Sequence, residues 1–180
     1  ENALEDQPSF SELKKEAETF TEQANLAEEQ LEQLAQSLAA EAKSAQEKAD
    51  DSTSDTNQAK TEMEQAIEDA KHAEELAQKL DDAANKATQE METGNATQQD
   101  VNDAVEAAEN AAKEAAQLSS LAEKASEDFE DIQEQATLDQ QAAETAMQES
   151  KQAAEQAESA ANLANSAEEL LEEFSNPFSS

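Results

Sequence analysis

The sequence predicts an all-α fold, an extended antiparallel helical bundle built on a long Ala-rich coiled-coil hairpin. Three observations lead to this prediction. Small apolar residues recur at alternating spacings of three and four residues from Phe10 to Phe178, the repeat that keeps one face of a helix against a partner helix. Ala, Glu and Gln, which all favour helices, dominate the composition. One segment near the middle, around the only Gly, interrupts the repeat.

The first run of this repeat predicts a helix over about residues 9–92. Ser9 and Glu12 match a capping box at its start, in which the Ser hydroxyl accepts a hydrogen bond from the backbone three residues on. Apolar residues, mostly Ala, then continue the repeat to Met91. Between Leu38 and Ala42 the apolar pattern slips by one residue, which predicts a local unwinding of the supercoil.

The segment 93–96 is the predicted turn. Gly94 is its structural residue, because it lies just past the last core position, where a helix end favours the left-handed conformation. Thr97 then caps a second helix over about 97–176, which Pro177 ends. We therefore expect residues 1–180 to form a single extended helical domain, with helices on the order of 120 Å long at ~1.5 Å per residue.

A hairpin that turns at Gly94 also predicts which seam residues face each other. The expected pairs include Ala17 with Leu171, Leu31 with Ala157, and Thr56 with Ile132.

A core lined by Ala buries little apolar area and is therefore weakly stabilised, since the stabilisation from burial scales with that area at ~25 cal/mol per Å². A second apolar stripe would stay half exposed and predicts a third layer, from chain folding or from self-association as a homodimer. It comprises Leu26, Ile67, Leu76, Val105, Leu121, Leu138, Met147, Leu163 and Leu170.

The polar segment 50–56 is the weakest part of the first helix, because Asp, Ser and Thr have low helix propensity. The partner stretch expected opposite carries Asp139 at a core position. If both helices broke here, the chain would form a four-helix bundle of half the length. Continuous or kinked helices are favoured, because the heptad phase is the same on both sides of the segment.

The charge of the chain limits its partners. Forty-five acidic and 11 basic residues give a formal charge of −34, which opposes binding to nucleic acid or to anionic lipid surfaces. There is no Cys, so disulfides and Cys-ligated metals are excluded. The sequence also contains no apolar run near the ~20 residues of a membrane-spanning helix.

One modification site and one metal-like pattern stand out. Asn95 begins the triplet Asn-Ala-Thr, a candidate N-glycosylation site at the predicted turn. Asp51, Thr53, Asp55 and Glu62 have EF-hand-like spacing, but Thr56 stands where the loop requires Gly, so a solvated acidic segment is favoured. No metal site is assigned.

The sequence offers no constellation for catalysis. His72, the only His, lies on a charged helix beside the core position Ala73, where we expect a surface residue. The many carboxylates follow the heptads and single out no acid–base pair. No catalytic or cofactor-binding residue is assigned, and we expect a non-enzymatic protein without a cofactor.

The whole chain resembles the glutamic-acid/alanine-rich surface proteins of trypanosomes and their alanine-rich relatives in insect-stage parasites. The matching features are the abundant Glu and Ala, the absence of Cys, the overall length, and long amphipathic helices such as Ala45–Met91 and Ala104–Ala125. The resemblance implies a helical bundle similar in core to variant surface glycoproteins, which usually carry Cys, unlike this chain. It also implies a C-terminal GPI anchor, attached at or beyond Ser179-Ser180, and a role as an abundant coat.

Several functional classes therefore remain open. The first is a protective coat protein at the cell surface, held to the membrane through a C-terminal lipid anchor that is not part of this chain. The second is a secreted fibrous protein, similar to the Ala-cored coiled-coil silks of insects. A helical surface receptor or adhesin, or an acidic mimic of nucleic acid, is a weaker alternative. The sequence identifies no host ligand and predicts no nucleic-acid partner.

The charge excess predicts that the fold gains stability when the carboxylates are screened or neutralised. We expect helix content and melting temperature to rise with added salt between about 0.01 and 1 M, and also at mildly acidic pH. Circular dichroism at 222 nm during thermal melts measures both quantities. A melting temperature that does not change with salt would show that repulsion among the −34 charges is weak.

Overall fold

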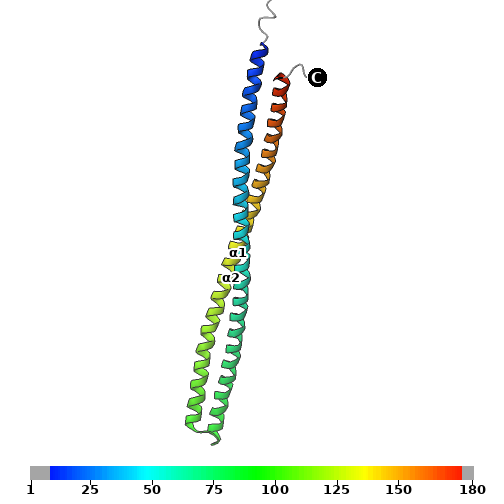
Figure 1. Cartoon of the computed structure of the whole chain (residues 1–180). Coiled ribbons are helices and arrows are strands. Elements are labelled where there is room, and N and C mark those ends of the chain that lie inside the picture. Colours follow the sequence, from blue (N-terminus) through cyan, green and yellow to red (C-terminus); the bar gives the residue numbers. More distant parts are fainter. Residues whose placement is uncertain (1–8, 176–180) are drawn as a thin grey trace, which may run out of the picture. The chain divides into compact units, whose positions relative to one another are not determined.

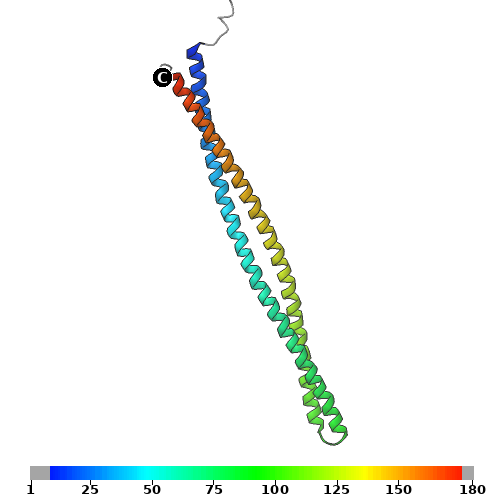
Figure 2. The same cartoon turned by 90° about the vertical axis from the view of Figure 1, so that its right-hand side faces the viewer.

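The fold consists of two long helices that pack against each other. The computed structural model describes residues 9–175, and these form α1 (Phe10–Glu92) and α2 (Gln98–Ser175), with no strand in that range. Both views show the two helices side by side (Figures 1 and 2). The prediction of an all-α fold made of two long packed helices is therefore confirmed. The predicted helix end at 176, Pro177, Phe178 and Ser179-Ser180 lie outside the described residues.

The chain divides into two compact units, each built from a part of both helices. We call residues 1–48 with 140–180 the terminal unit, and residues 49–139 the central unit. The polar segment 50–56 is helical within α1, and the stretch 132–139 is helical within α2. The helical break considered for this segment does not occur.

The core is a thin seam of Ala. Within residues 9–175, every buried apolar residue lies at a position that the 3-4 repeat assigns to the core, and no large side chain is fully buried. The buried polar residues among those described are Thr21 and Asp139. The buried apolar residues are Ala24, Ala42, Ala49, Ala70, Ala84, Val101, Ala108, Ala111, Ala115, Ala122, Ala143, Ala153, Ala157, Ala164 and Ala167.

The predicted seam is wrong at four positions near the start of α1. The exposed residues there are Leu13, Phe20, Ala27 and Leu34, whereas the buried or half-buried ones are Lys14, Thr21, Glu28 and Ala35. The contacting positions thus keep one heptad phase through Leu38 and Ala42, and the predicted slip is absent from the contact seam. The reason is that continuous packing requires one helix face, and the Ala-rich part of α1 sets that face. The four exposed residues, which include the largest apolar side chains of this stretch, each lie one position before a contact residue.

A hydrogen bond between the helices in the terminal unit agrees with the register expected from the turn. In the terminal unit, the Thr21 hydroxyl lies 2.8 Å from the Ala17 carbonyl oxygen and 3.3 Å from that of Ala167 on α2. The pairing of Ala17 with Leu171 places Thr21 opposite Ala167, as observed. Sequence reasoning missed Thr21 because the apolar pattern placed its neighbour Phe20 on the seam.

The second apolar stripe is exposed, as predicted for a seam of two helices. Its nine members, from Leu26 to Leu170, keep between 39% and 57% of their surface accessible. Single large apolar side chains are common on protein surfaces. A contiguous group of them indicates an interaction site.

Local hydrogen bonds end α1 and explain the turn. The Gly94 N–H donates to the Met91 carbonyl at 3.0 Å, and the Asn95 N–H donates to the Glu90 carbonyl at 2.8 Å. These two bonds form a Schellman motif. Gly94 has φ +82°, the left-handed conformation that side chains disfavour. At the other end, the Ser9 hydroxyl accepts from the Glu12 N–H at 3.3 Å and caps the helix.

Replacing Gly94 tests how much the left-handed turn contributes. We expect Gly94→Ala to lower the free energy of unfolding by about 1 kcal/mol, through backbone conformation alone. No heavy atom lies within 4 Å of the Cβ that Ala would add, so no clash contributes. Gly94→Asn is the matched variant, because Asn tolerates this conformation, and it should lose less. Urea denaturation followed by circular dichroism measures both, and equal losses would contradict the explanation.

Candidate functional site

The turn presents the candidate glycosylation site on an exposed surface. Asn95 is exposed, and its side-chain Nδ2 donates to the Thr93 hydroxyl at 3.2 Å. Its backbone N–H is held by the Glu90 carbonyl. The amide that would carry a glycan is therefore on the outside of the turn, so a glycan there would displace no buried group.

The third residue of the triplet has a structural role. The Thr97 hydroxyl accepts from the Asp100 N–H at 3.1 Å, and the Thr97 N–H donates to Asp100 Oδ2 at 2.8 Å. This reciprocal pair is a capping box at the start of α2. The bonds from the Thr97 backbone and side chain hold the pKa of Asp100 below its usual value. Thr97 thus serves the helix start whether or not Asn95 is modified.

A buried polar layer crosses the seam in the central unit. Asp139 is only 6% exposed. Its carboxylate accepts from the Ser52 hydroxyl on α1 and from Gln135 Nε2, the latter at 3.0 Å. The expectation that the polar segment 50–56 lies against the stretch containing Asp139 is correct. In an otherwise Ala-lined seam, such a layer favours the one register in which Ser52 and Asp139 meet.

The Thr hydroxyl groups of the segment 50–56 bond to the backbone of their own helix. Thr53 donates to the Ala49 carbonyl at 2.9 Å, and Thr56 donates to the Ser52 carbonyl at 2.8 Å. These bonds to the preceding turn satisfy side chains that would otherwise compete for the backbone. Asp51, Thr53, Asp55 and Glu62 therefore lie along a helix, whereas an EF-hand needs a loop that wraps around the ion. Within residues 9–175, no three His, Cys, Asp or Glu side chains are grouped to hold a metal.

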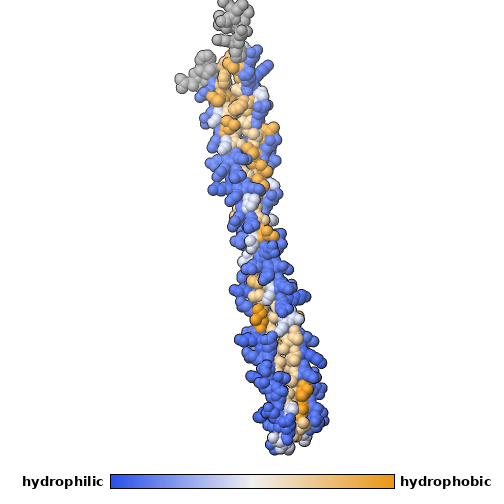
Figure 3. Space-filling model, turned by 180° about the vertical axis from the view of Figure 1, so that it is seen from behind, coloured by the Kyte–Doolittle hydropathy of each residue, from blue (hydrophilic) through white to orange (hydrophobic). Residues whose placement is uncertain are grey.

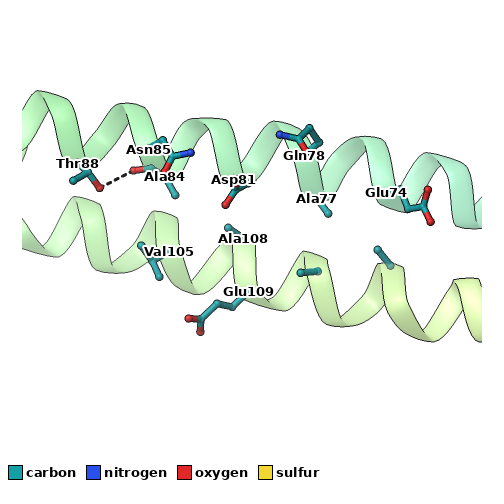
Figure 4. A pocket seen from close by; sticks show the side chains of 12 residues that line it. Glu74, Ala77, Gln78, Asp81, Ala84, Asn85, Thr88, Val105, Ala108 and Glu109 are labelled. Atoms are coloured by element: carbon teal, nitrogen blue, oxygen red, sulfur yellow. Dashed lines mark hydrogen bonds between the residues drawn. The ribbon is translucent and has the colours of Figure 1, made fainter.

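Shallow grooves along the central unit carry carboxylates and no catalytic pair. One groove lies between Glu74, Ala77 and Asp81 of α1 and Val105, Ala108 and Glu109 of α2 (Figure 4). The hydrogen bond drawn there joins the Thr88 hydroxyl to the Ala84 carbonyl, within α1. His72 borders another groove, is exposed, and lies 3.5 Å from Glu68 on its own helix. Neither groove places a nucleophile beside a base.

Comparison with known proteins adds no identification. No protein-family model, no curated protein and no solved structure matches the chain. Among the described residues, neither helix contains a stretch apolar enough to cross a membrane. The features that can carry function are thus the exposed turn, the buried polar layer, the acidic exterior and the exposed apolar residues.

A double-mutant cycle tests the contribution of the buried polar layer. We expect Ser52→Ala and Asp139→Ala to show a coupling energy of about 1.5–3 kcal/mol in urea unfolding, as for buried hydrogen bonds to a charged group. The control is the exposed pair Ser119 and Glu74, whose side chains form a 2.9 Å hydrogen bond between the same helices. Its coupling should stay below ~0.5 kcal/mol. A coupling at Ser52 and Asp139 no larger than at the control would contradict a specific role for the layer.

Proposed function

We propose that the chain is a non-enzymatic structural coat protein of a cell surface, anchored through GPI beyond its C-terminus and protective on a parasite. In this proposal it is an extended antiparallel coiled-coil hairpin. Both chain ends of such a hairpin lie opposite Gly94, so an anchor at one end would direct the turn and Asn95 outward. This arrangement suits an exposed glycan.

The observation that carries the proposal is a seam of small residues under an exterior whose charged side chains are mostly acidic. Alanines let two helices approach closely, so a narrow molecule forms from few large side chains. Narrow molecules can stand densely on a surface. The grooves described along the seam are open to solvent rather than enclosed, which favours a structural function over catalysis.

The charge of the exterior supports a shielding layer. Ion pairs join Lys60 to Glu64 and Lys86 to Glu90 within α1, and all four side chains are exposed to solvent. Such pairs stabilise a helix by only ~0.2–0.5 kcal/mol each. Most of the described carboxylates are exposed to water, and a dense layer of them would stay hydrated and repel anionic surfaces.

A secreted, Ala-cored fibrous protein is the second candidate. The exposed apolar stripe favours it, because fibres form when several chains cover each other's apolar faces. Dense assembly of chains with a charge of −34 would need neutralisation by Ca²⁺ or low pH. Formation of fibres on addition of millimolar Ca²⁺ would therefore support this candidate over the coat. The receptor or adhesin class has no specific observation in its favour.

Treatment of intact cells with a phospholipase that cleaves GPI anchors tests the coat. We expect antibodies to label unpermeabilised cells that make the protein, and the enzyme to release the protein into the medium. A surface protein with a membrane-spanning helix is the control and should remain on the cells. The sequon gives a second readout, since Asn95→Gln should abolish any mass shift caused by a glycosidase.

Two results would overturn the proposal. Antibody labelling only after permeabilisation would place the protein inside the cell. Recovery of the protein solely as fibres in the medium would instead favour the silk-like alternative.

A further inference from the structure

One face of the terminal unit combines large exposed apolar side chains from both helices. On α1, Phe20, Ala27 and Leu34 follow each other at seven-residue spacing, and all are exposed. Phe20 and Leu34 keep 46% and 45% of their surface accessible. On α2, Gln156, Leu163 and Leu170 have the same spacing, and both leucines are 52% exposed. We call these six residues the uncharged face.

The residues of the uncharged face lie on the same side of the seam. A groove between the helices is lined by Ala27 and Leu31 from α1 and by Gln156 and Leu163 from α2. Residues seven apart lie on nearly the same side of a helix. The groove therefore extends toward Phe20 and Leu34 on one helix and toward Leu170 on the other. Apolar side chains gather over both helices of this unit in Figure 3.

Most neighbours of the uncharged face are polar without charge, and the exceptions are Glu16, Glu155 and Glu173. Residues three apart are neighbours on a helix surface, and those that follow Phe20, Ala27 and Leu34 at this spacing are Gln23, Gln30 and Ser37. On α2 the flanking residues are Gln152, Ser159 and Ser166. Glu155 borders the groove, and Glu41 and Glu173 follow at the ends of the face.

An exposed Leu in the central unit has different surroundings. Leu76 is also 52% exposed, but its groove contains the carboxylates of Asp69 and Glu114 together with His72. Docking there would remove charged groups from water, which is costly. The groove of the uncharged face has one carboxylate, Glu155, so docking there removes fewer charged groups from water, in a chain whose formal charge is −34.

We propose that the uncharged face binds the same face of a second copy of this chain. A two-fold arrangement brings apolar side chains onto apolar side chains and keeps the carboxylates of both copies on the outer sides. The four helices would then form a bundle within the paired terminal units. Ala27, seven residues from both Phe20 and Leu34, would leave space for large side chains of the partner.

The charge pattern disfavours other occupants. A basic partner would be drawn to the carboxylates on the remaining surface rather than to a face without charge. Amphipathic helices that lie on membranes surround their apolar face with Lys and Arg. Here the flanking residues are Gln and Ser, and the surrounding charges are mainly acidic. A second copy carries the matching uncharged face and needs no opposite charge.

Sedimentation equilibrium of the full chain tests this inference, at about 0.15 M salt and at protein concentrations from about 1 to 500 µM. We expect a reversible monomer–dimer equilibrium. Leu163→Glu should raise its dissociation constant roughly a hundredfold or more, because a buried Leu is lost at both symmetry-related positions. Leu76→Glu is the matched control, with equal exposure and the same added charge, and should change the constant less than threefold.

Other results of these experiments would overturn or support self-association through the uncharged face. A wild-type chain that stays monomeric throughout, or a dimer weakened equally by Leu76→Glu, would overturn the inference. Leu163→Gln, which adds no charge, should also weaken the dimer, and circular dichroism of each variant confirms that the helices remain. Cosedimentation of monomeric wild type with phosphatidylcholine vesicles, lost in Leu163→Glu, would assign the face to lipid instead. These results do not depend on where the protein is located, so they are separate from the test of the coat.

Discussion

The close approach of two Ala-lined helix faces is the interaction on which this structure depends. Buried residues such as Ala24, Ala84 and Ala164 recur along both helices at one heptad phase. Small side chains allow close contact, but each contributes little apolar area. Stability must therefore accumulate over many weak layers, and this requires long helices whose contacting faces stay in phase. A break, slip or bulge in either helix would remove the packing contacts of every layer beyond it.

A seam of this kind specifies position poorly, because one Ala layer resembles the next. The polar groups in the seam compensate for this weakness. Asp139 accepts from Ser52 across the central unit, and Thr21 reaches the Ala167 carbonyl across the terminal unit. A shift of the helices by one turn would separate both pairs, and each lost hydrogen bond costs about 0.5–3 kcal/mol. The Thr21 hydroxyl and the Asp139 carboxylate would then keep their bonds within their own helices, to the Ala17 carbonyl and from the Gln135 amide. Few large side chains are available to provide the same discrimination.

Much of this fold follows from the sequence. The all-α class, the turn at Gly94 and most core positions from Ala42 onward are evident from periodicity, because Ala is both the small residue and the seam residue there. Near the start of α1 this equivalence fails. Leu13, Phe20 and Leu34 are the most apolar residues locally, yet Lys14, Thr21 and Glu28 occupy the contact positions. Sequence reasoning assigns the most apolar residues to the seam. In the structure, the face of α1 that contacts α2 is set by the Ala-rich remainder of the helix, and the residues near its start follow that face. The hydrogen bond of Ser52 with Asp139 could be placed only approximately, because it depends on the atomic positions of two polar side chains.

The offset of one residue in α1 has a structural consequence of its own. If Phe20 and Leu34 lay in the seam, α2 would cover them, and the seam would have to widen for large side chains. With Thr21 and Ala35 in contact, the Ala seam keeps its narrow spacing, and the large side chains remain available on the adjacent face. The helix thus divides its apolar surface between two neighbours, one of which is α2.

The charge pattern of the same stretch supports this division. The residues beside Phe20, Ala27 and Leu34 are mostly Gln and Ser, while Glu28, Glu29 and Glu32 lie at other positions around the helix. A solvent-facing helix surface in so acidic a chain would be expected to carry carboxylates throughout. Their scarcity around this face, together with the large apolar residues, is the physical basis for assigning it to a second copy.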